Sequence, residues 1–307
     1  MKRDLVSILD LEGELEDVID LAIKMKAQTR KGKCPQHLAG KVVAMIFEKP
    51  SLRTRVSFEV GTRQLGGQAL YLSPSEIQVG KRESVHDVAK VMSRFADIIM
   101  YRAFDYRIMK ELAKHAEVPV INGLDNLEHP CQIAADLMTV KEHRGKLKGL
   151  KLAWIGDGNN VCNSLLLATA MVGMDMSVAT PKGYEPNAGI VKEAKRLAKK
   201  NRTTITLTND VKAAAKGADV LVTDTWVSMG EEAEKAKKEA IFKEFQINQK
   251  LLFMADRNCV VMHCLPAHRG QEITDDVMDG PHSVVFDEAE NRLHAQKAIM
   301  VRLLGKA

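Results

Sequence analysis

The chain has 307 residues, 45% of them hydrophobic and 28% charged, and its 45 Lys and Arg against 40 Asp and Glu give a net charge of +5. This composition can fill a sizeable core, which excludes a disordered chain, and the length suggests two domains at about 100–200 residues each. The mild positive charge suits a small anionic substrate, and no dense basic block with interleaved aromatic residues points to nucleic acid.

The N-terminus and the cysteines argue against export or membrane insertion. Residues 4–17 quickly become acidic, unlike a secretory signal or a basic transit peptide. The longest apolar stretch, residues 164–174, is too short to span a bilayer. The five cysteines are odd in number and form no Cys-x-x-Cys pair. The sequence therefore predicts free thiols in a cytoplasmic protein that has no membrane partner.

Short runs of β-branched and apolar residues alternate with longer amphipathic segments, which is typical of parallel βαβ units. Strands are predicted, in chain order, at residues 42–47, 68–72, 97–101, 118–122, 150–155, 175–179, 203–207, 220–223, 260–263 and 283–286. Helices are predicted at residues 131–144, 231–244 and 291–304. The second of these carries charges at i,i+4 spacing, which indicates a solvated face. We expect an α/β fold with two domains, each a parallel sheet flanked by helices.

The domain boundary is expected at the polar, glycine-flanked break of residues 145–149. A first domain then spans residues 1–144 and a second spans residues 145–290, followed by a C-terminal helix at residues 291–307. In open parallel sheets, ligands bind beyond the C-terminal ends of the strands. The motifs at those ends are therefore the candidate sites.

The first predicted strand leads into Ser51-Leu52-Arg53-Thr54-Arg55, where a helix should begin. Ser51 is placed as its N-cap, and the free N–H groups of a helix N-terminus favour an anion. Two hydroxyls and two guanidinium groups within five residues add donors that suit phosphate. An ordinary capped helix would explain Ser51 but not the Arg-Thr-Arg cluster, so spacing alone leaves a phosphate site and a simple cap both open.

Three further candidates belong to the first half of the chain. Arg102 follows the strand at 97–101, and His129-Pro130-Cys131-Gln132 opens the next helix, with Pro130 suited to the first helical turn. Gln78 lies in a polar loop. Taken singly, an arginine, a histidine or a glutamine at such positions is more often structural than functional.

A glycine-rich turn, Gly156-Asp157-Gly158-Asn159-Asn160, follows the strand at 150–155 and could open the dinucleotide fingerprint of an oxidoreductase. The third glycine of that fingerprint would fall at Val161. The strand at 175–179 also lacks a following acidic residue to hold a ribose. Both features disfavour a nicotinamide cofactor.

Two later strands also end in polar residues. Asp224 follows the strand at 220–223, where a carboxylate can pair with a substrate ammonium, although a capping turn would explain it as well. The block His263-Cys264-Leu265-Pro266-Ala267-His268 follows the strand at 260–263. Its spacing is not a usual zinc pattern and no second ligand pair appears, so we expect no metal.

In this order and over nearly the whole chain, these motifs resemble those of the aspartate/ornithine carbamoyltransferase family. Residues 51–55 are similar to its carbamoyl-phosphate signature, with Leu52 where threonine is common. Two blocks, Asp224-x-x-x-Ser228-Met229-Gly230 and His263-Cys264-Leu265-Pro266, resemble members that act on ornithine. The resemblance implies transfer of the carbamoyl group of carbamoyl phosphate to the δ-amine of L-ornithine, giving L-citrulline and phosphate in arginine biosynthesis.

The resemblance also assigns roles. It implies that carbamoyl phosphate is bound by Ser51, Leu52, Arg53, Thr54, Gln78, Arg102, His129, Gln132, Cys264, Leu265 and Arg292. It implies that ornithine is bound by Asn160, Asp224, Ser228 and Met229, and that the catalytic residues are Arg102, His129, Asp224 and Cys264. It further implies a cis Leu265–Pro266 bond, no cofactor, and a C-terminal helix that returns to the first domain. The assembly it implies is a homo-oligomer, a trimer or a multiple of trimers, with the Gln78 loop reaching a neighbouring subunit.

Three alternatives stay open. A carbamoyltransferase for another amine, such as putrescine, would share the first domain, but the segment 224–230 suits an amino acid whose α-carboxylate needs a partner. A dinucleotide-dependent oxidoreductase and a non-catalytic binding protein of the same fold are the others. The motifs do not distinguish a biosynthetic from a catabolic direction.

Overall fold

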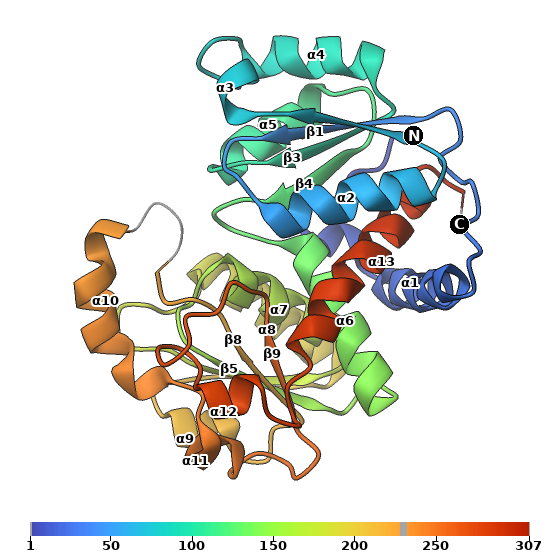
Figure 1. Ribbon diagram of the computed structural model, residues 1–307. Coiled ribbons are helices and arrows are strands. Elements are labelled where there is room, and N and C mark those ends of the chain that lie inside the picture. The colour runs from blue at the N-terminus through green and yellow to red at the C-terminus, as the bar shows by residue number, and fades with distance from the viewer. Residues whose placement is uncertain (1, 228–231, 307) are drawn as a thin grey trace. The chain divides into compact units, whose positions relative to one another are not determined.

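The computed structural model describes residues 2–227 and 232–306 (Figure 1). The chain divides into two compact units. The first unit comprises Met1–Met138 and Glu290–Ala307, and the second comprises Thr139–Ala289. Within the described residues, no helix combines the length and the apolar character that crossing a membrane requires.

The first unit is built on a parallel sheet of four strands in the order β2-β1-β3-β4. These strands are β1 (Val42–Phe47), β2 (Gln68–Leu72), β3 (Ile98–Arg102) and β4 (Val120–Leu124). Nearly all of β1 and the whole of β3 are buried, as expected for central strands covered on both faces. β2 lies at the edge of the sheet and is only partly buried.

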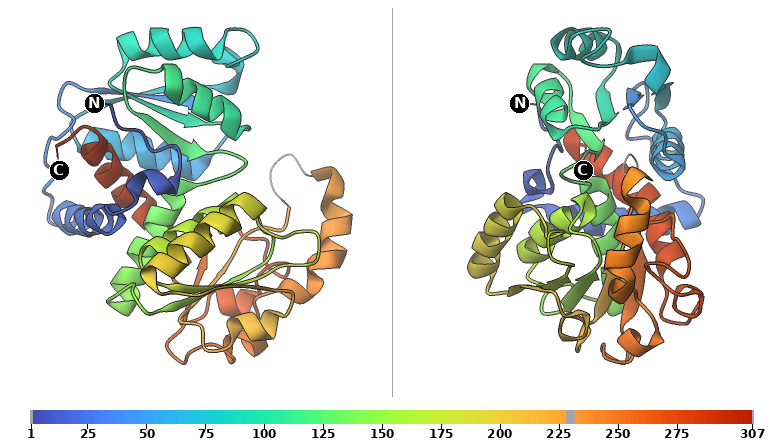
Figure 2. Two further views of the ribbon diagram at one scale, coloured as in Figure 1. Left: turned by 180° about the vertical axis from the view of Figure 1, so that it is seen from behind. Right: turned by 90° about the vertical axis from the view of Figure 1, so that its left-hand side faces the viewer.

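Helices cover both faces of this sheet (Figures 1 and 2). Those that lie wholly in the first unit are η1 (Ile8–Leu11), α1 (Leu15–Arg30), α2 (Leu52–Gln64), α3 (Pro74–Ile77), α4 (Val85–Phe95) and α5 (Tyr106–His115). α4 and α5 pack on one face around a core that includes Ile99, Val88 and Leu112. The helix α6 (Pro130–Arg144) begins in the first unit, and α13 (Val285–Leu303) ends in it.

The second unit has a parallel sheet of five strands in the order β7-β6-β5-β8-β9. These strands are β5 (Lys151–Ile155), β6 (Asp175–Ala179), β7 (Ile205–Thr208), β8 (Val220–Thr223) and β9 (Val260–His263). α7 (Asn160–Met171) and α8 (Ala188–Asn201) cover one face (Figure 2). The opposite face carries α9 (Val211–Ala215), α10 (Lys235–Phe242), η3 (Lys243–Phe245), α11 (Gln249–Leu252) and α12 (Asp275–Met278), and the short η2 (Glu232–Glu234) directly precedes α10.

Both sheets have a topological switch point, where the chain continues to one side of the first strand and later to the other. In the first unit it lies between β1 and β3, and in the second between β5 and β8. Loops leave the strands in opposite directions at such a point and open a crevice that binds ligands. The motif residues after β1, β3, β5 and β8 are therefore positioned by the strand order itself.

The α/β class with two parallel sheets is confirmed, and nine of the predicted strands lie within two residues of the observed ones. Two other sequence predictions need correction. Residues 283–286 do not form a strand. Ser283 makes only an isolated bridge to Val261, and α13 begins at Val285, six residues before the predicted start of the C-terminal helix. Asp287 and Glu288 fall in its first turn, where acidic side chains favour a helix over the strand that the β-branched pair suggested.

The predicted helix at 231–244 is divided into η2, α10 and η3, and its face is not simply solvated. Lys238 and Phe242 are buried, with Phe242 against the rings of Tyr184, Trp226 and Phe245. Charges at i,i+4 spacing identified the helix but concealed this aromatic contact. The C-terminal helix does pack on the first unit, where Lys297 donates to Gln64 and Thr29.

Candidate active site

The predicted phosphate motif begins α2. Ser51 is its N-cap, and the Ser51 hydroxyl accepts a hydrogen bond of 3.3 Å from the backbone N–H of Thr54. Leu52 is 73% exposed, whereas Thr54 is 1% exposed. Phe58 and Gly61 bury the other side of the helix, and a side chain at Gly61 would press on Lys297 of α13. Packing thus fixes α2 with its N-terminal N–H groups at the C-terminal end of β1.

Two arginines from distant parts of the chain meet at Thr54. Arg102, at the end of β3, donates from Nη1 to Thr54 Oγ1 over 3.3 Å, and Arg292, in α13, donates from Nη2 over 3.2 Å. Both guanidinium groups are buried, at 5% and 3% exposure. A hydroxyl has two acceptor sites and one donor. Because both acceptor sites take a guanidinium N–H, the Thr54 hydroxyl acts toward any further partner only as an O–H donor.

Gln132 continues this network. Its Oε1 accepts from Arg292 Nη1 over 2.6 Å, and its Nε2 donates to the buried carboxylate of Asp136 over 2.8 Å. A guanidinium only donates and a carboxylate only accepts, so the two partners fix the orientation of the Gln132 amide. Its oxygen therefore faces Arg292.

His129 precedes α6 and is buried. The loop before it is held by Asp125, whose carboxylate accepts from the N–H groups of Leu127 and Glu128 at 2.7 Å. Burial, followed by the charges of Arg292, Arg102 and Lys49, holds the pKa of His129 well below its ordinary value. The ring is therefore neutral near pH 7, where it can donate one N–H without adding positive charge.

Sequence reasoning missed Lys49, two residues before Ser51. Burial and the neighbouring Arg102 lower the pKa of Lys49 to about 8. Its Nζ lies 4.8 Å from the centre of the Phe104 ring. Glu48 accepts a 2.6 Å hydrogen bond from the N–H of Phe104 and so joins the ends of β1 and β3. The only sequence signal was the position of Lys49 beside the phosphate motif.

Among the described residues, Gln78 makes no hydrogen bond to the cluster around Thr54. It is exposed and ends α3 with φ of 50°, and its carbonyl accepts from the N–H groups of Lys81 and Arg82. Ser51, Arg53, Thr54, Arg102, His129, Gln132 and Arg292 belong to the first unit. Within it, hydrogen bonds join Thr54, Arg102, Gln132 and Arg292 directly.

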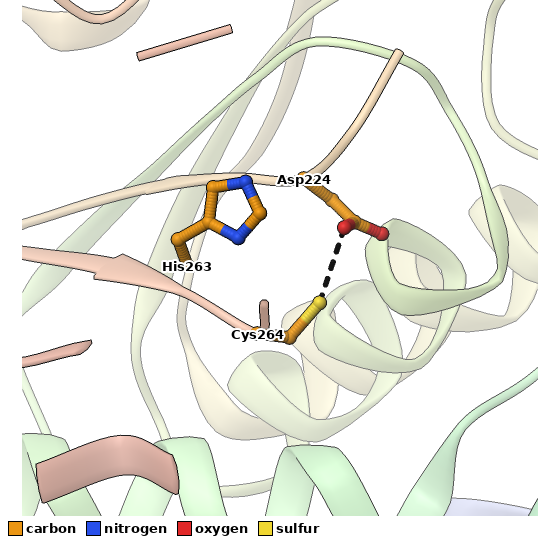
Figure 3. Close-up of side chains that lie close together, drawn as sticks. All are labelled: Asp224, His263 and Cys264. Carbon is orange, nitrogen blue, oxygen red and sulfur yellow. Dashed lines mark hydrogen bonds between the residues drawn. The ribbon is translucent and has the colours of Figure 1, made fainter. Parts of the chain in front are cut away.

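In the second unit, Asp224 and Cys264 meet at the ends of the adjacent strands β8 and β9 (Figure 3). Cys264 Sγ donates to Asp224 Oδ1 over 3.1 Å, and the N–H of Thr225 donates to the same oxygen over 2.8 Å. Asp224 Oδ2 accepts from Asn159 Nδ2 over 2.8 Å. Asp224 is 8% exposed, so this carboxylate is buried, and its described hydrogen-bond donors are an amide, a backbone N–H and a thiol.

His263 lies behind this pair and is fully buried. Its Nδ1 accepts from the N–H of Leu265 over 2.9 Å, and its Nε2 faces the buried carboxylate of Glu272 over 3.0 Å. The Asp224, His263 and Cys264 ligand atoms lie within 4.8 Å of one another, the one such group among the described residues (Figure 3). Because both His263 nitrogens are already bonded, only Asp224 and Cys264 offer ligands. This arrangement does not form a tetrahedral protein site.

Leu265 has φ of 60°, and the Leu265–Pro266 bond is cis, which confirms that expectation. Asn160 is the first residue of α7 and is partly buried. Ser228 and Met229 lie outside the described residues. Gly158 lies against the backbone of residues 184–186 and donates to the carbonyl of Tyr184. That backbone occupies the approach that a dinucleotide pyrophosphate needs at the second glycine, which further disfavours the oxidoreductase alternative.

Comparison with known proteins agrees with this geometry. Residues 3–142 match the model of the aspartate/ornithine carbamoyltransferase carbamoyl-P binding domain, and residues 148–303 match that of the Asp/Orn binding domain. The chain is 53% identical over 304 residues to a catabolic ornithine carbamoyltransferase of Thermoplasma acidophilum, covering 99% of both chains. It is 55% identical over 302 residues to an ornithine carbamoyltransferase of Methanobrevibacter smithii, covering 98% of this chain and 99% of that one.

Among solved structures, ornithine carbamoyltransferase from Pyrococcus furiosus superimposes with a TM-score of 0.97 at 48% identity. The match covers 100% of this chain and 98% of that one. The two family models together span nearly the whole chain, and these curated relatives are more than 50% identical to it. Both comparisons indicate the same family. The chain belongs to the aspartate/ornithine carbamoyltransferase family and is a carbamoyltransferase.

Proposed function

We propose that this enzyme transfers the carbamoyl group of carbamoyl phosphate to the δ-amine of L-ornithine, giving L-citrulline and phosphate. The observation that carries the choice of ornithine is the buried carboxylate of Asp224 beside Cys264. An anion at this position attracts a side-chain ammonium and repels the side-chain carboxylate of aspartate. Relatives named ornithine carbamoyltransferase support the same choice.

Residues 1–144 bind carbamoyl phosphate in this proposal, residues 145–290 bind ornithine, and residues 291–307 return to the first domain and bring Arg292 with them. The phosphate is held by Ser51, Arg53, Thr54 and Arg102, with the backbone of Leu52 and, from its loop, Gln78. Support comes from the Thr54 hydroxyl, whose acceptor sites are filled by Arg102 and Arg292. Its one O–H is therefore available to donate to carbamoyl phosphate.

The carbamoyl carbon is activated by polarisation of its oxygen. Attack by the amine breaks the C=O π bond and builds negative charge on that oxygen, where Thr54, Arg102 and neutral His129 donate. In well-studied acyl transfers one such donor is worth about 3–4 kcal/mol. The carbamoyl NH₂ is held by acceptors, namely the Gln132 oxygen and the Leu265 carbonyl, and the fixed Gln132 amide supports this role.

The δ-amine must lose a proton before it attacks, because a free amine of this kind has a pKa of about 10.4. Asp224 pairs with the ammonium and orients it, and Cys264 lies beside that carboxylate. The ammonium releases its first proton to solvent, and the amine lone pair then forms the new C–N bond. The C–O bond to phosphate breaks, and the departing phosphate accepts the second proton, which the attacking nitrogen releases. Asn160, Ser228 and Met229 complete the binding of ornithine in this proposal. The substrate amine is the nucleophile, so neither a metal nor an organic cofactor is called for.

The chain also forms a homo-oligomer, a trimer or a multiple of trimers. An exposed apolar stripe on α2 supports this proposal: Leu52, Val56 and Val60 repeat every four residues and are 73%, 47% and 37% exposed. Exposed apolar rows of this kind are typical of interaction surfaces. Five free cysteines suit the cytoplasm. We place the reaction in arginine biosynthesis, the direction in which transfer from an acyl phosphate to an amine is downhill.

The test is formation of the ureido product from carbamoyl phosphate, with ornithine, putrescine, N-acetylornithine and aspartate compared side by side. Turnover confined to ornithine supports the proposal. Turnover with another acceptor would keep the carbamoyl-phosphate assignment and overturn the role of residues 224–230. Comparing carbamoylation of ornithine with phosphorolysis of citrulline at cellular concentrations tests the biosynthetic direction, which a faster reverse reaction would contradict.

A further inference from the structure

Asn159 has hydrogen bonds of two kinds, one from each end of its amide. Its Oδ1 accepts from the N–H groups of Val161 and Cys162, at 3.0 and 3.1 Å, and so caps α7. Its Nδ2 donates to Asp224 Oδ2 over 2.8 Å. Because the oxygen is committed to two helix N–H groups, the amide cannot turn over. Its NH₂ must face Asp224.

The effect of the Asn159 amide on the charge of Asp224 depends on the other hydrogen-bond partners of that carboxylate. Among the described residues the carboxylate accepts from an amide, a backbone N–H and a thiol, none of which carries a positive charge. Neutral donors hold an ionised carboxylate in place without cancelling its charge. A lysine or arginine at position 159 would pair with Asp224 and compete with a substrate ammonium.

The two residues come from the two sides of the switch point of the second sheet. Asn159 lies between β5 and α7, Asp224 directly follows β8, and β5 and β8 are neighbours in the sheet. The bond thus ties the direction of a buried carboxylate to the N-terminus of a helix whose residues are nearly all buried. Asn160, proposed to contact ornithine, is the next residue along the chain.

We infer that Asn159 is a positioning residue for the reaction: it orients the Asp224 carboxylate and leaves its charge for the side-chain amine of the acceptor. This inference rests on the proposed function and deepens it. The role is distinct from capping, since a cap requires only the oxygen of residue 159. Substitutions that keep the cap and change only the bond to Asp224 separate the two roles.

Asn159→Asp is the sharpest variant. Aspartate caps a helix as well as asparagine does, and its charge is favoured at a helix N-terminus. It would place a second carboxylate within hydrogen-bond distance of Asp224, and two such groups cannot both ionise at their ordinary pKa. The pair therefore keeps one shared proton to a higher pH than either carboxylate would alone. We expect kcat/KM for ornithine to gain a second proton dependence, so that its logarithm against pH steepens from slope one to slope two on the acid side.

Asn159→Ser keeps a capping oxygen but is too short to reach Asp224. We expect kcat/KM for ornithine to fall about 10- to 100-fold at every pH, the size expected for a lost hydrogen bond to a charged group, without the added proton dependence. For both variants the KM for carbamoyl phosphate should stay within about twofold of wild type, and the thermal midpoint should stay well above the assay temperature.

Asn187 provides the matched control. It caps α8 in the same way, with Oδ1 accepting from Gly189 and Ile190 at 2.9 and 3.2 Å, and it is exposed. Asn187→Asp repeats the chemical change at a cap that bonds none of the proposed catalytic residues within the described chain, and its kinetics should match wild type.

Wild-type kinetics for Asn159→Asp and Asn159→Ser would overturn the inference. So would losses that follow a fall in thermal midpoint and affect both substrates equally, because that pattern assigns Asn159 to capping alone. The wild-type enzyme is assayed first on ornithine. If the wild type makes no ureido product from ornithine, the proposed function is overturned. If the wild type is active and the Asn159 variants have the same kinetics as the wild type, only this inference is overturned.

Discussion

Nη1 of Arg292 donates a 2.6 Å hydrogen bond to Oε1 of Gln132, joining residues that lie 160 positions apart. The same guanidinium reaches Thr54 through Nη2. One planar fork therefore orients both the amide proposed to hold the carbamoyl NH₂ and the hydroxyl proposed to donate to carbamoyl phosphate. Lysine offers a point charge and cannot replace such a fork.

Arg292→Lys should accordingly lower kcat/KM for carbamoyl phosphate by about 10- to 100-fold, the effect expected for loss of charge-assisted hydrogen bonds, with a smaller change for ornithine. Initial rates at varied concentrations of each substrate measure this. Arg302→Lys is the control, because Arg302 lies on the same helix and pairs with Glu14, away from the cluster around Thr54. Equal effects of the two substitutions would contradict the proposed role.

Arg53→Ala should weaken carbamoyl-phosphate binding strongly, raising its KM by at least about tenfold, because a guanidinium proposed to contact phosphate is removed. The comparison is with Arg63→Ala in the same helix, whose side chain is 69% exposed and pairs with Glu59. Surface pairs of this kind contribute little. Near-normal kinetics of the Arg53 variant would remove Arg53 from the phosphate site.

The pKa of His129 lies well below its ordinary value because the ring is buried among positive charges. The unfolded chain should titrate near pH 6.5, so between that pH and the lower folded pKa the unfolded state binds more protons. Stability should therefore decrease as pH falls below 6.5, by up to about 1.4 kcal/mol per pH unit from this residue. Denaturant titrations at pH 7.5, 6.5 and 5.5 measure the free energy of unfolding. As the pH falls, this free energy should decrease less in His129→Gln than in the wild type. A His129→Gln variant that keeps the wild-type slope would refute the assignment.

The cysteines should react in two classes. Burial raises the pKa of Cys131 and of Cys259 to about 12, and that of Cys162 rises well above its ordinary value. Only Cys34 and Cys264 are partly exposed. Iodoacetamide should therefore label these two in the native enzyme, since thiolate and access both control the rate. Peptide mass spectrometry locates the labels. In a Cys34→Ser background, the loss of activity should proceed at the same rate as labelling of Cys264. Bound ornithine should slow both. Inactivation without label at Cys264 would be inconsistent with its position.

The apolar stripe on α2 predicts the assembly. Val56→Asp with Val60→Asp should shift the protein to a smaller species in light scattering, because two charges would have to be buried at the interface. The control is Phe253→Asp, which introduces a charge at a side chain that is 84% exposed in the second unit. It should leave the mass of the assembly unchanged. A wild type that is monomeric, or a double variant of unchanged mass, would exclude this surface as the interface.

Strands and helix starts follow from local patterns, and these patterns were enough for the α/β class. Ser51 could be identified as a cap because the signal spans only three residues. The bond between Thr54 and Arg292 spans 238 residues, and no local pattern indicates such a contact. The strand predicted at 283–286 failed because a β-branched pair also fits the first turn of a helix when acidic residues follow.

Asn159 shows a different limit of sequence reasoning. An asparagine ahead of a helix is explained fully by capping, so nothing in the sequence calls for a second partner. Its bond to Asp224 depends on β5 and β8 being neighbours, although they are separated in the chain by β6 and β7. Lys49 escaped notice because its lowered pKa arises from burial and from Arg102, both properties of the folded unit.

The first unit is interrupted in the chain, with Met1–Met138 completed by Glu290–Ala307. Lys26 donates a hydrogen bond to Asn291, which lies 265 residues later in the chain. Thr54 accepts one from Arg292, which lies 238 residues later. During synthesis from the N-terminus, the ribosome must make the entire second unit before the missing helix is available. The cluster around Thr54 is therefore completed last, by closure of a very long loop, and a chain stalled before residue 290 lacks the bonds of Arg292 to Thr54 and Gln132.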